Sequence, residues 1–280
     1  MSTYLPLLKR LIPPALWRPA SQVRYALDRV AQWPAATFHP WRRKSLSLLG
    51  RYHNLHRGQR CFIIGNGPSL RQTDLSKLKR EFTFGLNRIY LAFDQMGFLP
   101  TYYVSVNDLV IEQCLREILA LPMPKFLSWR SRRFFTYPPD ETTIFLHTTH
   151  TGPKFAADAR ERLWEGATVT YVALQLAYYM GFQRVILVGV DHSFSTQGKP
   201  NTTVVSQGED RDHFHASYFG KGFRWQLPDL ETSERAYRMA KEAFERAGRE
   251  VLDATIGGKL QVFPKVDYEK LFDEKPAGSK

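Results

Sequence analysis

The chain of 280 residues contains only two cysteines, Cys61 and Cys114, and they lie far apart. They match no metal-binding or redox spacing and give no disulfide framework, so we expect a reducing, cytoplasmic compartment. No apolar run approaches the roughly eighteen residues that a membrane-spanning helix needs. The first sixteen residues are interrupted by Pro13 and Pro14 and lack the continuous apolar segment of a secretory signal, so export is not expected.

Acidic residues are scarce at the start of the chain. Residues 1–60 contain eleven Lys and Arg but a single acid, Asp28, whereas the remaining residues hold 28 basic against 26 acidic side chains. Most of the formal charge of +12 therefore belongs to a basic extension, residues 1–57, that is also rich in Trp and Pro. Such a composition suits an anionic membrane surface, and an arm that packs on the domain is the alternative. Prolines limit the predicted helices here to short pieces such as 21–32.

From residue 60 onward short apolar runs alternate with helical patterns. The alternation predicts a Rossmann-like α/β domain over residues 58–280, with a mostly parallel sheet and helices on both faces. The stretch 192–229 is long, aromatic and without periodicity, so we expect it to form an ordered lid. The predicted strands are 60–64, 81–86, 102–106, 125–129, 143–147, 184–190 and 250–254, and the predicted helices are 109–120, 169–180 and 231–249.

Glycines cluster directly after the first predicted strand, in the run Gly65-Asn-Gly-Pro-Ser69. Glycines allow a tight turn and let backbone N–H groups approach a phosphate, and Ser69 adds a hydroxyl; a Gly-Pro turn without a ligand is the alternative. The run lacks the Gly-Lys-Ser/Thr ending of a P-loop. Leu70 replaces the third glycine of the dinucleotide fingerprint and the second strand ends in Asn87 instead of an acidic residue, which disfavours a dehydrogenase.

Asparagines stand at or near the carboxyl ends of three successive predicted strands, at Asn66, Asn87 and Asn107. The carboxyl ends of parallel strands form the edge at which open sheets bind ligands. An Asn side chain offers both a donor and an acceptor, which suits the sugar hydroxyls and base edge of a nucleotide. Each of them alone is typical of a turn, but three at matching strand ends indicate a nucleotide site.

Histidines follow acidic residues at two places in the second half of the chain, Asp191-His192 at the end of the apolar strand and Asp212-His213 in the predicted lid. A histidine beside a carboxylate can act as a general base because the carboxylate fixes its tautomer. We expect His213 to be this base, with Asp191 at the same sheet edge; a structural or solvated loop histidine is the alternative. The spacings match no zinc or calcium pattern.

Cations and aromatic side chains are combined in the run 218–225 of the predicted lid. Cations can neutralise phosphates and aromatic rings can stack on a base or a sugar. A surface hairpin without a ligand is the alternative interpretation. The candidate ligand-binding residues of this run are Tyr218, Lys221 and Arg224.

Four motifs together resemble the 6-hydroxymethylpterin diphosphokinase MptE-like family, over roughly residues 58–265. This family is related to bacterial CMP-sialic-acid-dependent sialyltransferases and to motility accessory factor glycosyltransferases. The resemblance implies a Rossmann-like fold and, for the sialyltransferases, inverting transfer without a metal. The motifs are Gly65-Asn-Gly-Pro-Ser-Leu70, Gly85-Leu-Asn-Arg-Ile-Tyr90, Gly166-Ala-Thr-Val-Thr-Tyr171 and Gly189-Val-Asp-His192.

The resemblance also implies roles for individual residues. His213, followed by Phe214, matches the family's general base, and Thr168-Val-Thr170 stands where the sialyltransferases have Thr-Ser-Gly. Ser193 and Phe194 stand where those enzymes place tyrosines that assist departure of the phosphate, so Lys221, Arg224 or Tyr218 would replace them. The residues that would hold the nucleotide are Gly65, Asn66, Gly67, Ser69, Asn87, Asn107, Thr168 and Thr170.

Three functions are compatible with these features. The leading one is an inverting glycosyltransferase with a nucleotide-activated, CMP-linked acidic sugar as donor and a glycan or lipid-linked acceptor at the inner membrane face. It needs no cofactor and could be a homo-oligomer. The second is a Mg²⁺–ATP-dependent diphosphokinase with Asp108, Asp191 or Asp212 as metal ligands. A nucleic-acid-binding protein is supported only by the charge of the extension.

Overall fold

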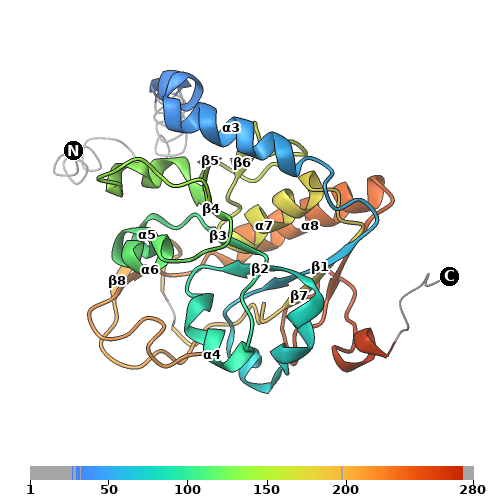
Figure 1. The fold of residues 1–280 in the computed structure, drawn as a ribbon. Coiled ribbons are helices and arrows are strands. Elements are labelled where there is room, and N and C mark those ends of the chain that lie inside the picture. The colour runs from blue at the N-terminus through green and yellow to red at the C-terminus, as the bar shows by residue number, and fades with distance from the viewer. Residues whose placement is uncertain (1–26, 28–29, 32, 197, 274–280) are drawn as a thin grey trace, which may run out of the picture. The chain divides into compact units, whose positions relative to one another are not determined.

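The computed structural model describes residues 27, 30–31, 33–196 and 198–273 (Figure 1). They form two compact units that divide between Arg43 and Lys44. The expected helix over 21–32 falls mainly outside the described residues. None of the described helices is both long and apolar enough to cross a membrane. The expectation of an extension that ends at residue 57 stays a prediction, although the second unit already begins at Lys44.

The second unit is built on an eight-stranded sheet whose neighbouring strands all pair in parallel. The strand order β10-β7-β1-β2-β3-β4-β5-β6 confirms the predicted Rossmann-like α/β class. The chain moves outward from β1 to β6 and then returns to β7 on the other side of β1, which makes the β1–β7 junction a topological switch point. The strands are β1 (Arg60–Ile64), β2 (Phe82–Leu86), β3 (Tyr102–Ser105), β4 (Lys125–Ser128), β5 (Thr143–Thr149), β6 (Arg162–Trp164), β7 (Arg184–Val188) and β10 (Glu250–Asp253).

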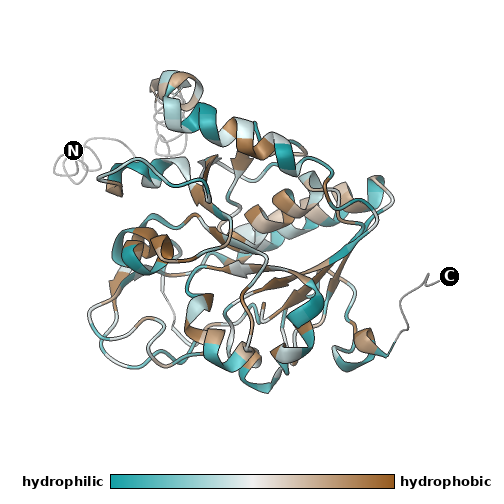
Figure 2. Cartoon of the chain, viewed as in Figure 1, coloured by the Kyte–Doolittle hydropathy of each residue, from teal (hydrophilic) through white to brown (hydrophobic). Residues whose placement is uncertain are grey.

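The central strands are apolar because helices cover both faces of the sheet. Cys61, Ile63, Val185 and Leu187 are fully buried on the face that α7 (Val169–Tyr179) and α8 (Leu230–Arg246) cover. Figure 2 shows the strands as the hydrophobic centre of the fold. The opposite face is covered by shorter elements, namely η2 (Pro68–Gln72), η3 (Leu75–Arg80), η4 (Ile89–Ala92), α4 (Phe93–Met96), α5 (Asp108–Gln113), α6 (Leu115–Leu119) and η6 (Glu269–Phe272).

One helix was missed and one predicted helix was wrong in its extent. The chain forms α3 (Pro40–Tyr52), a helix of 13 residues that the sequence analysis did not single out. Pro40 stands at its first position, where a helix needs no N–H group from the backbone. The predicted helix 109–120 is divided into α5 and α6 at Cys114, whose backbone leaves the helical region at φ −123° and ψ 22°.

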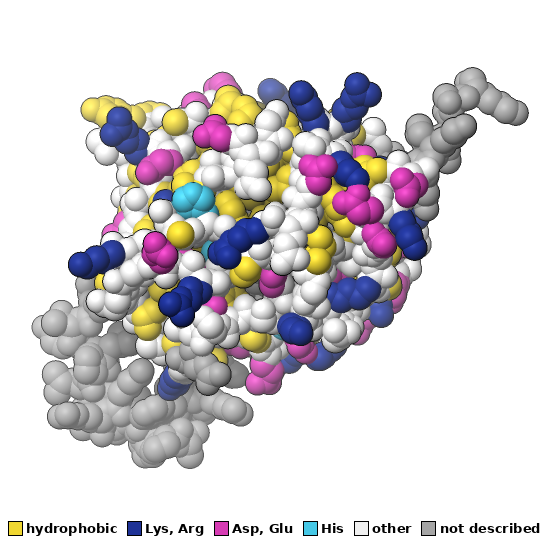
Figure 3. Space-filling model, turned by 90° about the horizontal axis from the view of Figure 1, so that it is seen from below, with side chains coloured by type: hydrophobic (Ala, Val, Ile, Leu, Met, Phe, Trp, Pro, Cys, Tyr) yellow, Lys and Arg dark blue, Asp and Glu magenta, His cyan; other side chains and the backbone are white. Residues whose placement is uncertain are grey.

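The predicted lid contains a hairpin that is wider than the one considered as the alternative for residues 218–225. Within residues 192–196 and 198–229, β8 (Thr203–Val205) pairs with β9 (Arg224–Gln226) in antiparallel fashion. The segment is anchored by the buried aromatic side chains of Phe214, Tyr218 and Phe219. The 3-10 turn η5 (Trp129–Phe134) completes the described elements of the domain. Acidic and basic side chains are interspersed over the face in Figure 3, as expected for the balanced charge of this domain.

Candidate functional site

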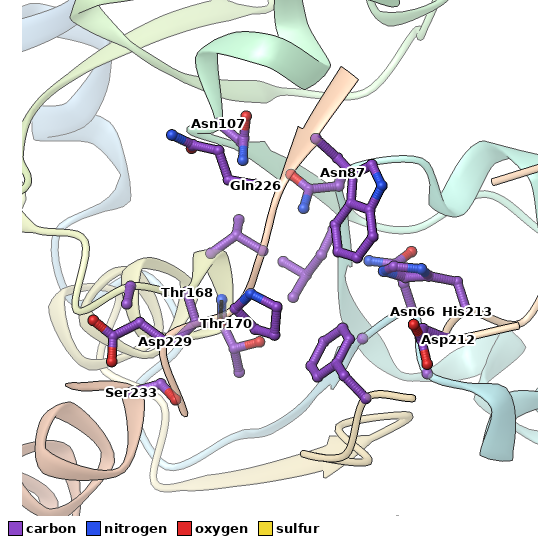
Figure 4. Close-up of a pocket in the computed structure, with 18 of the residues that line it drawn as sticks. Asn66, Asn87, Asn107, Thr168, Thr170, Asp212, His213, Gln226, Asp229 and Ser233 are labelled. Carbon is purple, nitrogen blue, oxygen red and sulfur yellow. Dashed lines mark hydrogen bonds between the residues drawn. The ribbon is translucent and has the colours of Figure 1, made fainter. Parts of the chain in front are cut away.

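A cavity of about 460 Å³ lies at the carboxyl ends of the central strands. The turns after β1, β2, β3 and β7 form the floor of the cavity. The described residues of the 192–229 segment form a wall that faces this floor. Figure 4 shows Asn66 and His213 at one end of it and Thr168, Asp229 and Ser233 at the other. The cavity therefore occupies the edge, and the switch point, at which parallel sheets bind ligands. The predicted residues that line it are Gly65, Asn66, Gly67, Asn87, Asn107, Thr168, Thr170, Asp191, His213 and Tyr218.

The glycine turn packs directly against the end of β7. The backbone N–H groups of Gly65 and Gly67 donate to the carbonyls of Val188 (2.7 Å) and Gly189 (2.9 Å). A Cβ atom added at Gly65 would lie 2.3 Å from the Gly189 oxygen. These glycines are thus required for backbone contact between two strand ends, and their N–H groups are satisfied within the protein.

Ser69 is also engaged within the protein. Its backbone N–H and its hydroxyl donate to the two carboxyl oxygens of Asp191, at 3.0 and 2.7 Å. Burial raises the pKa of Asp191, although the bonds from Ser69 oppose that shift. Ser69 does not line the cavity. Its hydrogen bonds instead fasten the glycine turn to Asp191.

The three asparagines that line the cavity differ in the hydrogen bonds that their side-chain oxygens accept. The side-chain oxygen of Asn66 is buried and has no hydrogen-bond partner among the described residues. The side-chain oxygen of Asn87 accepts a bond from the Ser105 hydroxyl (3.0 Å), and that of Asn107 caps α5. Because a buried polar atom without a partner costs free energy, Asn66 is the best placed of the three to bind a ligand.

His213 is held by a carboxylate and by an aromatic ring. Its Nδ1 lies 2.8 Å from Oδ2 of Asp210, and its ring stacks on Tyr218 at 4.0 Å with an interplanar angle of 8°. A proton on Nδ1 would be donated to this carboxylate, which favours the tautomer with a free lone pair on Nε2. The backbone N–H of Phe219 also donates to Asp210. A histidine oriented by a carboxylate is an arrangement that general bases use.

Two arginines hold the His213 segment by its backbone. Arg71 donates to the carbonyls of His213 (2.7 Å) and Phe214 (2.9 Å). Arg88 donates to the carbonyls of Ser217 and Tyr218. Since the Phe214 N–H also donates to the Asn66 carbonyl, the segment that carries His213 is fixed directly to the glycine turn.

Both expected His–Asp neighbour pairs were wrong. Asp212 does not contact the His213 ring but accepts bonds from the backbone N–H groups of Ser195 and Thr196. His192 pairs with Glu234 of α8 at 3.3 Å and not with Asp191. Adjacent side chains in an irregular loop point in different directions, so sequence neighbours need not interact.

The cations predicted in the lid lie away from the cavity. Arg224 forms an ion pair with Glu112 at 3.0 Å, and Lys221 is exposed; neither lines the cavity. Tyr218 does line it, and burial raises the pKa of its hydroxyl. Thr168 caps α7 by accepting a bond from the Thr170 N–H.

A second polar cluster at the cavity was missed. Arg130 bridges Asp108 and Glu165, and Glu165 also pairs with His150 at 2.8 Å. Burial works to raise the pKa of Glu165, but the bond from His150 and the charge of Arg130 outweigh it and lower that pKa to about 2. No motif marks this cluster, because its members follow four different strands.

The lining is rich in acids and poor in cations. Among the described residues, no Lys or Arg lines the cavity, and no group of three His, Cys, Asp or Glu side chains could hold a metal ion. Each acid at the cavity is engaged by a partner in the protein. The lining acids are Asp108, Glu165, Asp191, Asp212 and Asp229.

Residues 41–197 match the profile of a family described as 6-hydroxymethylpterin diphosphokinase MptE-like. The chain belongs to this MptE-like family. A comparison with curated proteins gave no match.

Two solved structures are similar to this MptE-like chain. A MAF glycosyltransferase from Magnetospirillum magneticum AMB-1 is 14% identical, with a TM-score of 0.47, over 92% of this chain and 43% of that one. The sialyltransferase CstII from Campylobacter jejuni, in complex with the substrate analogue cytidine-5'-monophosphate, is 12% identical, with a TM-score of 0.44, over 75% of this chain and 85% of that one. The chain thus spans less than half the length of the Magnetospirillum protein.

Replacing Gly67 with alanine should destabilise the domain by about 1–3 kcal/mol, the usual cost of overpacking. The new Cβ would lie 1.8 Å from Oδ2 of Asp191, which must then move away from Ser69. Gly50→Ala is the matched control because nothing lies within 4 Å of its Cβ position and alanine favours a helix. Urea unfolding measures both variants. Equal stability of Gly67→Ala and the wild type would contradict the close packing described above.

Glu165 should make the domain sensitive to acid. Its pKa is lowered in the folded state, so its contribution is present above the unfolded value near 4.5 and is lost as pH falls toward about 2. Glu165→Gln should therefore lose stability at pH 7, on the order of 1.4 kcal/mol per unit of pKa shift, and show less loss on acidification. Glu141→Gln, at an exposed ion pair with Lys44, is the control. Parallel stability–pH curves for Glu165→Gln and the wild type would refute this role.

Proposed function

We propose that this chain is a metal-independent, inverting glycosyltransferase that uses a nucleotide-activated sugar, with a CMP-linked acidic sugar as the leading donor. One observation carries the proposal: the His213–Asp210 pair stands on the wall of a cavity at the switch point of a parallel sheet. A partly buried histidine that is oriented by a carboxylate is suited to remove a proton from an acceptor hydroxyl.

The proposed reaction is a single displacement. Nε2 of His213 takes the proton of the acceptor hydroxyl as that oxygen attacks the anomeric carbon of the donor. The bond between this carbon and the phosphate oxygen breaks on the opposite face, and the nucleotide leaves with the bonding electrons. Proton transfer of this kind contributes roughly 10²–10⁴-fold to the rate.

The cavity suits a ligand whose phosphate does not need a cation beside it. A CMP-linked acidic sugar carries one negative charge on its phosphate and another on the carboxylate of the sugar, whereas ATP carries more charge on its phosphates and is commonly bound through cations or Mg²⁺. No lining Lys or Arg in the described part of the chain could supply such charges. Asn66, Asn87 and Asn107 would instead bind the nucleotide through hydrogen bonds, together with Thr168 and Thr170.

Tyr218 is the proposed group that assists departure of the phosphate. Of the three candidates from the lid, it alone lines the cavity, while Lys221 and Arg224 lie outside it. Because burial raises the pKa of Tyr218, its hydroxyl stays protonated and can donate a hydrogen bond to a phosphate oxygen.

The acceptor is proposed to be a glycan or a lipid-linked sugar in the synthesis of a bacterial surface glycan. In this proposal the enzyme works in the cytoplasm and the basic extension, residues 1–57, brings it to the anionic inner face of the membrane. Nucleic acid is not a proposed partner, and a homo-oligomer stays a prediction.

Pyrophosphoryl transfer is the second candidate because the MptE-like family is described as a diphosphokinase. That chemistry needs Mg²⁺ held by carboxylates. Asp108 is paired with Arg130 and Arg133, and Asp191 is bonded to Ser69. Asp212 is bonded to the 195–196 backbone. The three carboxyl groups are therefore occupied separately, which favours sugar transfer.

Nucleotide binding separates the two candidates. CMP should raise the melting temperature of the full chain equally with Mg²⁺ and with a chelator, and Asn66→Ala should weaken this shift. Under the second candidate only ATP with Mg²⁺ would stabilise the protein. A thermal-shift series with CMP, UDP, GDP and ATP measures this, and no response to any of the four would reject both candidates.

His213→Ala should keep the shift by CMP but lose transfer from a CMP-linked donor by roughly 10²–10⁴-fold. Asp210→Asn should also reduce turnover and change its pH dependence, because the amide no longer fixes the tautomer of His213. His215→Ala is the matched control, since this exposed histidine lies two residues away and does not line the cavity. Released CMP reports turnover. If His213→Ala and His215→Ala lost turnover equally, His213 would not be the general base.

A further inference from the structure

The described part of residues 1–43 exposes several large apolar side chains. Residues 27–38 are helical where they are described. Four of the eleven exposed large hydrophobic residues of the described chain lie in this short segment: Leu27 (65% exposed), Val30 (71%), Trp33 (55%) and Phe38 (65%). Spacings of three, three and five residues place them on one side of a helix. We call these four residues the apolar face.

Two aromatic rings of the apolar face contact each other. Trp33 and Phe38 meet edge to face, with their centroids 5.8 Å apart. The hydroxyl of Thr37 donates to the Trp33 carbonyl, as is usual within a helix. The two rings therefore form an exposed aromatic pair, and Leu27 and Val30 are exposed in the same segment.

The same unit carries a strong positive charge. Residues 1–43 contain seven basic side chains against one acid, so half of the chain's formal charge of +12 lies in this short unit. A partner with negative charge is favoured. The basic residues are Lys9, Arg10, Arg18, Arg24, Arg29, Arg42 and Arg43.

We propose that the apolar face inserts into the headgroup region of an anionic lipid bilayer, which the net positive charge of residues 1–43 attracts. Arg42 is only 1% exposed and does not take part in this contact. Charge alone would suit a nucleic acid equally well, but a nucleic acid offers no apolar layer for an exposed Val, Leu and Phe. Trp and Phe are suited to the boundary between headgroups and acyl chains. The proposal rests on the membrane association proposed above and names the part of the extension that makes the contact; its test does not depend on what the cavity binds.

The position of the apolar face in the chain supports this assignment. The family match begins at residue 41, so the face lies before the part of the chain that the family shares. None of the described helices could span a bilayer. A helix that lies in the interface needs one apolar side and an excess of positive charge nearby. The apolar face supplies the first and the sequence of residues 1–43 the second.

The test is co-sedimentation of the full chain with vesicles of phosphatidylcholine alone and of phosphatidylcholine mixed equally with phosphatidylglycerol. We expect the chain to bind the mixed vesicles and to bind them more weakly as salt rises from about 0.15 M to about 1 M. The reason is that the Debye length, over which charges interact, falls to about 3 Å. The double variant Trp33→Ser/Phe38→Ser should bind roughly tenfold more weakly. Leu99→Ser/Tyr137→Ser removes two exposed apolar side chains elsewhere and should bind like the wild type.

Three results would overturn the proposal. The first is that Trp33→Ser/Phe38→Ser binds mixed vesicles as tightly as the wild type while its melting temperature is unchanged. The second is that the wild type fails to prefer anionic vesicles. The third is that sedimentation velocity shows self-association, lost in the double variant, without vesicle binding, in which case the apolar face joins two copies of the chain.

Discussion

The ends of β1 and β7 are fastened to each other beyond the sheet, and the candidate site depends on that contact. Gly65 and Gly67 donate to the carbonyls at the end of β7, and Ser69 donates twice to Asp191. Side chains larger than hydrogen cannot enter this contact at the two glycines. The separation of the two strand ends is thereby fixed, and with it the floor of the cavity.

His213, the proposed general base, is positioned by backbone contacts that start from the same turn. The Asn66 carbonyl accepts from the Phe214 N–H, and Arg71 and Arg88 bind four carbonyls of the segment that carries His213. Asp210 then sets the orientation of the imidazole. A loop without regular structure can hold a catalytic group accurately when its carbonyls are bound in this way.

The sequence predicted the seven long strands because their apolar runs are continuous or nearly so, whereas β6, β8 and β9 have only three residues each. It predicted the strand-end asparagines because carboxyl ends of parallel strands converge. It could not predict that His213 pairs with Asp210 instead of Asp212, since the loop path is set by Arg71 and Arg88. The Arg130–Glu165 pair joins residues far apart in the chain, so no local pattern could reveal it.

Charge and backbone conformation together bear on how the cavity would select a ligand under the proposed function. Four of the five described non-glycine residues with positive φ line it, namely Asn87, Ala167, His192 and Asn201. Such conformations cost free energy and cluster where a site must hold a fixed shape. With acids engaged internally and no lining cation in the described chain, selection would rest on hydrogen bonds and not on charge. Sites built in this way reject analogues that lack the matching polar group, because a buried partner such as the Asn66 oxygen is then left unpaired.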